Sequence, residues 1–103
     1  MTSLRKKSVA LRKATLSALK AIQFMEYDVE FFNEVDGVIR ASVARSPFNL
    51  GSVIEVNIRP HLSEEVQIDV KSSPTSFNLV NLGINQRIET SLRDQISQLL
   101  NQQ

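Results

Sequence analysis

Hydrophobic and polar residues change their spacing twice along this chain. Within residues 4–25, apolar or small residues recur at the period of a helix, so their side chains lie on one side of it. This first stripe consists of Leu4, Leu11, Thr15, Ala18, Ile22 and Met25. Residues 84–100 repeat at the same period, and their shared face holds Ile84, Ile88, Leu92, Ile96 and Leu99. The sequence therefore predicts one amphipathic helix near each end.

Between these helices, apolar and polar residues alternate, which is typical of strands with one buried face. Four such segments occur, at residues 27–31, 39–43, 54–59 and 66–71. The dipeptide Asp36-Gly37 predicts a type I′ hairpin turn between the first two segments. Pro60 is expected to end the third strand, because proline lacks the N–H that a β-ladder needs.

These elements predict a single α+β domain over residues 1–103, in the order α-β-β-β-β-α. Short connections favour a four-stranded antiparallel meander sheet, and the N-terminal and C-terminal helices must cover its one apolar face. The expected architecture is thus a two-layer sandwich. Residues 1–7 are expected to fray, because the helix dipole disfavours the cations at residues 5–7 in a first turn, so the stable helix should start near Ser8.

The net charge of +1 hides an uneven distribution of charged residues. The first 25 residues hold six basic residues and no acidic residue, whereas the rest of the chain holds six basic and eleven acidic residues. Three interpretations stay open: the solvated face of a surface helix, a contact with an anionic membrane, RNA or acidic protein, and a leader resembling a transit peptide. The candidate basic patch consists of Arg5, Lys6, Lys7, Arg12, Lys13 and Lys20.

The residue inventory favours a binding domain over an enzyme. The chain has no cysteine and one histidine, His61, which excludes disulfides and thiolate metal sites and disfavours a Ser-His-Asp triad. Its three glycines lie far apart and form no phosphate-binding loop. Neighbouring carboxylates such as Glu64 and Glu65 are expected to be solvated. We therefore expect no catalytic residue, no metal, no cofactor and no transmembrane segment.

A motif at the start of the last helix carries a family resemblance. Gly83, Asn85, Arg87 and Ile88 form a Gly-x-Asn-x-Arg-Ile signature, which follows a serine-rich turn at Ser72 and Ser73 and a loop that contains Phe48. With the order of elements, this pattern resembles the domain of unknown function 1499 family over most of the chain. The resemblance implies a helix at each end of four strands and a bacterial, especially cyanobacterial, or plastid source. It implies no settled activity.

The same motif has two physical interpretations. Gly83 can adopt the positive φ that turns a loop into a helix, and either Asn81 or Asn85 can accept hydrogen bonds from first-turn N–H groups. Arg87 lies one turn further, within reach of loop carbonyls or of a carboxylate. The motif is then a clamp that holds residues 77–82 on the core. Alternatively, Gly83, Asn85 and Arg87 form a candidate site for a small ligand or anion at the helix N-terminus.

The sequence predicts a non-catalytic binding or scaffold domain. Its partner is expected to be another protein or a second copy, since open sheet edges pair readily, or a small apolar ligand. The alternative is a peripheral factor that binds an anionic membrane or RNA through the basic N-terminal helix. We expect a cytoplasmic location, with a plastid or membrane-peripheral location as the alternative. The expected apolar cleft is lined by Phe31, Ile39, Val56, Ile68 and Leu92.

Overall fold

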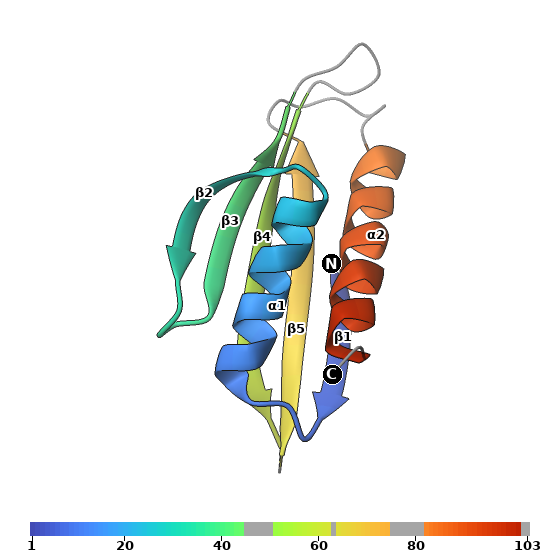
Figure 1. Ribbon diagram of the computed structural model, residues 1–103. Helices are drawn as coiled ribbons and strands as arrows, with labels where there is room; N and C mark the ends of the chain where they lie inside the picture. The colour runs from blue at the N-terminus through green and yellow to red at the C-terminus, as the bar shows by residue number, and fades with distance from the viewer. Residues whose placement is uncertain (45–50, 63, 75–81, 102–103) are drawn as a thin grey trace.

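The computed structural model describes residues 1–44, 51–62, 64–74 and 82–101, with only the backbone of Leu82. It holds one antiparallel sheet and two helices, which confirms the α+β class. Figure 1 shows both helices on the same face of the sheet. The strands are β1 (Thr2–Lys7), β2 (Asp28–Asn33), β3 (Val38–Val43), β4 (Ser52–His61) and β5 (Glu65–Pro74), and the helices are α1 (Leu11–Phe24) and α2 (Leu82–Asn101).

The prediction of four strands is wrong, because residues 2–7 form a fifth strand instead of the start of a helix. β1 pairs with β5, and the order across the sheet is β1-β5-β4-β3-β2. Side chains along β1 alternate between partly buried and exposed, which is the period of a strand. Leu4 fits a helix and a strand equally well. The cations at residues 5–7 oppose a helical first turn but suit an exposed edge.

The helix α1 therefore begins later than predicted. Ser8 has a φ of 59° and its N–H donates to the carbonyl of Glu64 at 2.8 Å, which closes the β1–β5 pairing before the chain turns. At the other end, Glu26 has a φ of 63° and the N–H of Tyr27 donates to the carbonyl of Ile22 at 3.2 Å. This is the Schellman arrangement, which turns the chain into β2.

The strands β2 to β5 neighbour one another in chain order, as the meander prediction requires. The register of β2 against β3 shifts between Val29 and Phe31. A bulge of this kind adds one residue and reverses the alternation after it. Phe31 therefore lies on the open face of the sheet, with Arg40 5.5 Å from its ring centroid, while Phe32 packs on the core. The prediction that Phe31 faces inward is wrong.

The turn between β2 and β3 is also of a different type. Gly37 has a φ of 66°, but Asp36 has no positive φ, and a type I′ turn requires both. Instead, the Asn33 side chain holds the turn. Its Oδ1 accepts a hydrogen bond from the Asp36 N–H at 3.1 Å, and its Nδ2 donates to the Asp36 carboxylate at 3.0 Å.

Pro60 does not end β4, which continues to His61. The N–H of Ile58 donates to the carbonyl of Gly37 at 2.7 Å, so it points toward β3. By the alternation of an antiparallel ladder, the nitrogen of Pro60 points to the same side. β3 begins only at Val38, which pairs with Asn57. No strand of the described structure therefore needs the hydrogen that proline lacks.

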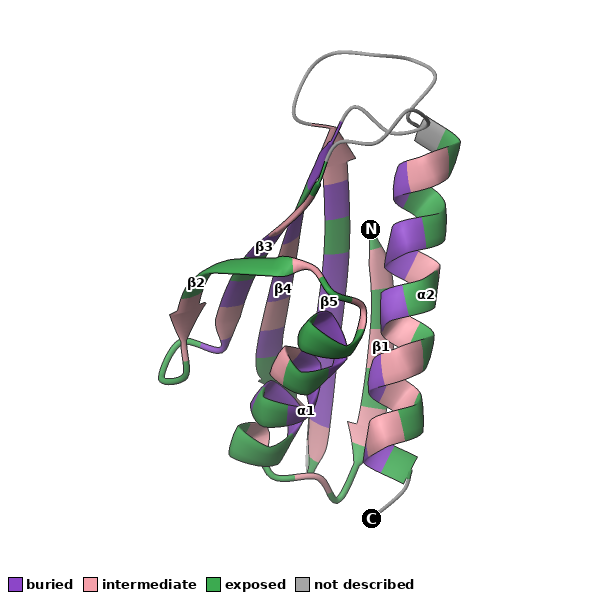
Figure 2. Ribbon diagram, turned by 45° about the horizontal axis from the view of Figure 1, so that its top comes forward, coloured by how far each residue is buried: buried purple, intermediate pink, exposed green. Residues whose placement is uncertain are grey.

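The core lies between the sheet and the two helices. Figure 2 shows the buried side of each helix turned toward the strands. The prediction of a helix over residues 84–100 is confirmed, and its buried positions include Ile88, Leu92 and Ile96. In α1, small residues at Ala14, Ala18 and Ala21 allow close packing on the sheet. Phe48 and residues 77–81 of the predicted clamp lie outside the described residues.

Candidate functional site

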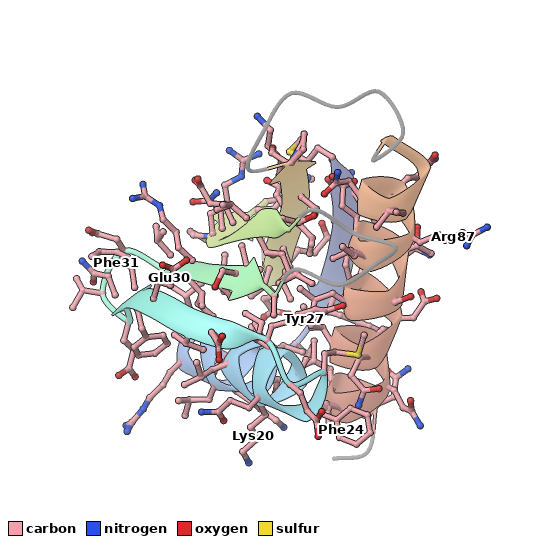
Figure 3. The ribbon with its side chains drawn as sticks, turned by 90° about the horizontal axis from the view of Figure 1, so that it is seen from above. Lys20, Phe24, Tyr27, Glu30, Phe31 and Arg87 are labelled. Atoms are coloured by element: carbon pink, nitrogen blue, oxygen red, sulfur yellow. The ribbon has the colours of Figure 1, made fainter. Side chains whose placement is uncertain are left out.

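The solvent-facing side of α1 carries both cationic and apolar residues. We define the α1 outer face as Arg12, Lys13, Leu16, Lys20 and Phe24. Leu16 is 37% exposed and Phe24 is 69% exposed. A shallow pocket of about 300 Å³ lies among the first four of these residues, next to Ala10 and Ser17. Figure 3 shows Lys20 and Phe24 pointing away from the sheet.

Helical spacing explains why these side chains share one face. Lys13, Lys20 and Phe24 follow at intervals of seven and four residues, which returns each to the same side of a helix. The opposite side is buried on the sheet. The sequence of α1 contains no acidic residue. In the described part of the chain, Lys13 and Lys20 form no ion pair, so their charges are available to a partner.

Arg12 differs from these two lysines, because its Nε lies 3.0 Å from Oε1 of Glu34 in the β2–β3 turn. The Arg12 and Glu34 side chains are 79% and 42% exposed. Exposed pairs of this kind contribute little to stability, about 0–1 kcal/mol. Arg12 can therefore exchange Glu34 for another anion at small cost.

The structure does not gather the six residues of the candidate basic patch into one surface. Arg5, Lys6 and Lys7 lie on β1, whereas Arg12, Lys13 and Lys20 lie on α1. Two of the β1 cations have polar partners inside the domain. Nε of Arg5 donates to Oε1 of Gln67 at 3.2 Å, and Nζ of Lys6 donates to Oδ1 of Asn101 at 2.8 Å.

The three residues of the candidate ligand site do not face a common space. Gly83 lies inside α2 without a positive φ, so the prediction about its backbone is wrong. Asn85 is 5% exposed, and its Oδ1 accepts a hydrogen bond from Oγ of Ser72 at 2.6 Å. Arg87 is exposed and points away from the domain in Figure 3. Gly83 and Arg87 line a shallow pocket that does not include Asn85.

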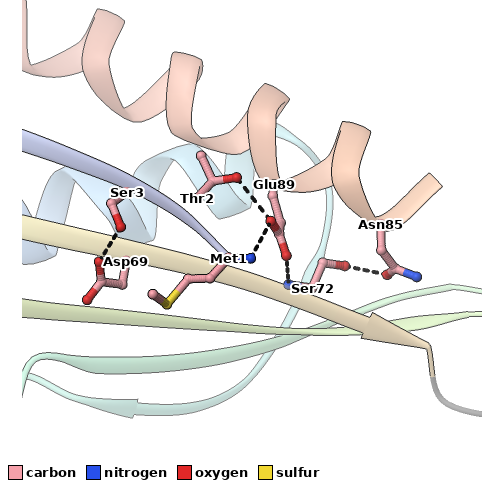
Figure 4. A network of polar contacts seen from close by, with 7 residues as sticks. All are labelled: Met1, Thr2, Ser3, Asp69, Ser72, Asn85 and Glu89. Atoms are coloured by element: carbon pink, nitrogen blue, oxygen red, sulfur yellow. Dashed lines mark hydrogen bonds and ion pairs between the residues drawn. The ribbon is translucent and has the colours of Figure 1, made fainter. Parts of the chain in front are cut away.

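A carboxylate that was not among the candidate residues, that of Glu89, lies beside Asn85. Glu89 is 7% exposed, and Figure 4 shows the polar contacts that surround it. Oε1 accepts a hydrogen bond from Oγ1 of Thr2 at 3.0 Å and lies 3.3 Å from the amino group of Met1. Oε2 accepts the backbone N–H of Ser72 at 2.8 Å. These contacts join α2 to β1 and β5.

The contact with Ser72 satisfies a donor that the sheet leaves unpaired. Val70 is the last residue of β5 that pairs with β1, and Ser72 lies two residues further. Buried N–H groups without a partner are costly, so a carboxylate here has a structural use. Glu89 lies three residues before Leu92 and seven before Ile96, so helical spacing places it beside the apolar stripe of α2, which is the sequence signal of its burial.

Substituting Glu89 with alanine is expected to lower the free energy of unfolding by about 1–3 kcal/mol, because the N–H of Ser72 loses its partner. Urea unfolding of the full chain measures this change. Asp94→Ala is the control, since Asp94 lies on the same helix but its side chain is 64% exposed. Equal unfolding midpoints for the two variants would show that the Glu89 contacts do not stabilise the packing of α2 against β1 and β5.

The open face of the sheet carries a network around Asp69, which is 5% exposed. Oδ1 accepts hydrogen bonds from Oγ of Ser3 at 2.7 Å and from Nε2 of Gln67 at 2.9 Å, and Oδ2 lies 3.1 Å from Nη2 of Arg59. Burial by itself would raise the pKa of Asp69. The two hydrogen bonds and the charges of Arg59 and Arg5 outweigh burial and lower this pKa below its ordinary value.

This lowered pKa predicts acid sensitivity. A carboxyl whose pKa is lower in the folded state contributes stability above its unfolded pKa, and this contribution is lost as the pH falls through the folded pKa. The stability advantage of the wild type over Asp69→Asn should therefore shrink below about pH 4. Urea unfolding of both proteins at a series of pH values measures it. An advantage that stays constant down to the lowest pH would contradict this role of Asp69.

The residues of the expected apolar cleft are divided between two faces. Ile39, Val56, Ile68 and Leu92 have no exposed surface and pack within the core. Phe31 lies on the open face of the sheet and is 46% exposed. These five residues therefore do not line one cleft.

Comparison with known proteins shows the fold. No family model and no curated protein matches the chain. Among solved structures, it is similar to the crystal structure of the adenylate sensor from AMP-activated protein kinase in complex with 5-aminoimidazole-4-carboxamide 1-β-D-ribofuranotide (ZMP). The TM-score is 0.68 at 13% sequence identity, over 91% of this chain and 94% of that chain. At this identity, the likeness shows a shared fold alone.

Two expectations from the sequence stay predictions: the resemblance to the domain of unknown function 1499 family, and the cellular location. Neither described helix is long and apolar enough to span a bilayer.

Proposed function

We propose that this chain is a non-catalytic binding domain that docks on an anionic membrane surface through the α1 outer face. The observation that carries the proposal is the combination of Lys13 and Lys20 with exposed Leu16 and Phe24 on one helix face. Helices that lie on a membrane combine cations, which attract anionic lipid headgroups, with apolar side chains that enter the headgroup region. An exposed phenylalanine at the end of such a stripe fits this use.

The open face of the sheet, which lies away from α1, carries both acidic and basic side chains. Arg40 and Arg59 on this face lie within ion-pair distance of Glu55 and Asp69, whereas Lys13 and Lys20 form no ion pair in the described part of the chain. The α1 side therefore offers unpaired cations to an anionic surface. Each cation near an anionic bilayer contributes about 1 kcal/mol, so Lys13 and Lys20 with Phe24 support weak and reversible binding.

Sedimentation of the full chain with vesicles tests the proposal. Vesicles of phosphatidylcholine with phosphatidylserine should bind the protein at low salt, and pure phosphatidylcholine should bind it far less. Replacing Lys13 and Lys20 together with glutamate should weaken binding at least about tenfold. The matched control replaces Lys71 and Arg87 with glutamate, which makes the same change in net charge on other exposed faces.

Three results would contradict the proposal. The wild type could fail to bind the anionic vesicles at low salt. The control variant could lose as much binding as the α1 variant, which would show attraction by net charge alone. Single-stranded RNA could bind the α1 face more tightly than the vesicles do, which would favour the RNA alternative. Phe24→Ala separates the apolar contribution, because its effect on vesicle binding should persist at higher salt.

A further inference from the structure

In the described part of the chain, the sheet ends in two edges without a further strand, and these edges differ in shape and charge. β2 forms one edge, and it carries Asp28 and Glu30 and the bulge after Val29. A bulge on an edge strand interrupts the regular ladder that a further strand would need. β1 forms the other edge, and it pairs with β5 without a shift in register. The β1 edge is therefore the regular edge of this sheet.

The backbone groups at the β1 edge can be assigned from one hydrogen bond. The N–H of Ser8 donates to the carbonyl of Glu64 at 2.8 Å, and this pair continues the β1–β5 register. Hydrogen-bonded positions alternate along an antiparallel strand. The backbone groups of Ser3, Arg5 and Lys7 therefore point away from β5. Their side chains also alternate to the exposed face of the sheet.

No described element pairs with these backbone groups. α2 packs on the inner face of the sheet, where Nζ of Lys6 donates to Asn101. β1 is the last strand in the order across the sheet, as Figure 1 shows. The edge thus offers backbone donors and acceptors beside three consecutive cations, Arg5, Lys6 and Lys7.

We propose that the free edge of β1 binds an extended acidic segment of a partner protein, which adds to the sheet as a sixth strand. Backbone hydrogen bonds would supply affinity in this mode, and side chains on alternate positions would supply specificity. Acidic side chains opposite Arg5 and Lys7 form favourable cross-strand pairs. This edge is separate from the α1 outer face, so the two proposals can fail independently.

Charge argues against a second copy of this chain as the occupant. An antiparallel pairing with the β1 of another copy that uses all three outward positions, Ser3, Arg5 and Lys7, places Arg5 opposite the same arginine, and like charges on adjacent strands repel. The acidic β2 edge of another copy has suitable charge, but its bulge interrupts a regular ladder. An acidic strand from a different protein meets neither obstacle.

Nuclear magnetic resonance of the ¹⁵N-labelled full chain tests the proposal with a defined probe. The probe is an acetylated and amidated peptide that alternates glutamate with valine, and the matched peptide alternates lysine with valine. The glutamate peptide should shift the amide signals of Ser3, Arg5 and Lys7 in a saturable and salt-sensitive way. It should leave the signals of Lys13 and Lys20 unchanged. The lysine peptide should cause no shift.

Two sets of variants separate backbone pairing from charge. Ser3→Pro removes an outward N–H without removing a β1–β5 hydrogen bond, as edge positions allow, and it should abolish binding of the glutamate peptide. Ser3→Ala is its control, because it also loses the hydroxyl bond to Asp69 but keeps the N–H, and it should bind like the wild type. Replacing Arg5 and Lys7 together with glutamine should weaken binding at least about threefold. Thermal unfolding confirms that each variant is folded.

Three results would overturn the proposal: no shifts with the glutamate peptide, equal binding of the lysine peptide, or shifts confined to β2 or α1. A concentration-dependent dimer that Ser3→Pro dissociates would assign the edge to a second copy instead, and would also overturn it.

Discussion

Gly37→Val is expected to destabilise the domain by about 3–5 kcal/mol. A Cβ atom at Gly37 would lie 2.2 Å from the carbonyl oxygen of Ile58, a distance that real Cβ contacts essentially never show. The obstructing atom belongs to the backbone of β4, so no side chain can move aside. The φ of 66° adds strain, because β-branched residues rarely adopt positive φ. The substitution must therefore separate the β2–β3 turn from β4.

Urea unfolding of Gly37→Val and the wild type measures this loss. Gly83→Ala is the control, because a Cβ there meets no atom within 4 Å and the residue lies in α2. Alanine at this helical position should leave stability unchanged or raise it by up to about 1 kcal/mol. If Gly37→Val unfolded at the same urea concentration as the wild type, the described approach of the turn to Ile58 would be wrong.

Deleting residues 1–7 is expected to lower the melting temperature by at least about 15 °C, or to abolish cooperative unfolding. The deletion removes β1 from the sheet and Leu4 from its place against the core. It also removes the bond from Thr2 to Glu89 and leaves the adjacent edge of β5 unpaired. A segment that merely frayed from a helix would have no such effect.

A substitution that leaves β1 in place separates the contribution of its backbone pairing to stability from the contribution of its charges. Replacing Arg5 and Lys7 with glutamine removes two cations but retains every β1–β5 backbone bond. This variant should melt within a few degrees of the wild type, since exposed charges contribute little to stability. Thermal unfolding followed by circular dichroism compares it with the deletion. An unchanged melting temperature in the deletion would contradict the assignment of residues 2–7 to the sheet.

The segments that the sequence located correctly are those with a strong and unambiguous period. Ile54, Val56 and Ile58 alternate with polar residues and are β-branched, so a strand is the one element that buries them together. The predicted C-terminal helix succeeds for the same reason. In contrast, Leu4 is the one large apolar residue within residues 2–7, and a single position cannot define a period. The assignment of β1 depends on the neighbouring β5, which is distant in the sequence.

Two errors arise from local backbone geometry. The bulge after Val29 reverses the faces of the residues that follow, and its sign in the sequence is the consecutive pair Phe31 and Phe32, which breaks the alternation. The hairpin turn type depends on the φ of Asp36, which the Asn33 side chain controls by bonding to it.

The sequence shows the cations of the candidate site, but it does not show that they lie on two separate elements, β1 and α1. β1 ends at Lys7, and the turn that begins at Ser8 separates Arg5, Lys6 and Lys7 from the lysines of α1. The exposure of Phe24 also depends on the length of α1. The role of Glu89 needs Thr2 and Ser72 beside it, which are contacts between distant parts of the chain.

The most direct test of the proposed membrane docking is the fluorescence of a single tryptophan placed at Phe24. The chain has no natural tryptophan, so Phe24→Trp reports on that position alone. Leu62→Trp is the matched control, because Leu62 is 81% exposed and lies in the β4–β5 turn, not on the α1 outer face. With vesicles that contain phosphatidylserine, the emission of Phe24→Trp should shift to shorter wavelength, while that of Leu62→Trp should not. No shift at position 24, or equal shifts at both positions, would contradict docking through the α1 outer face.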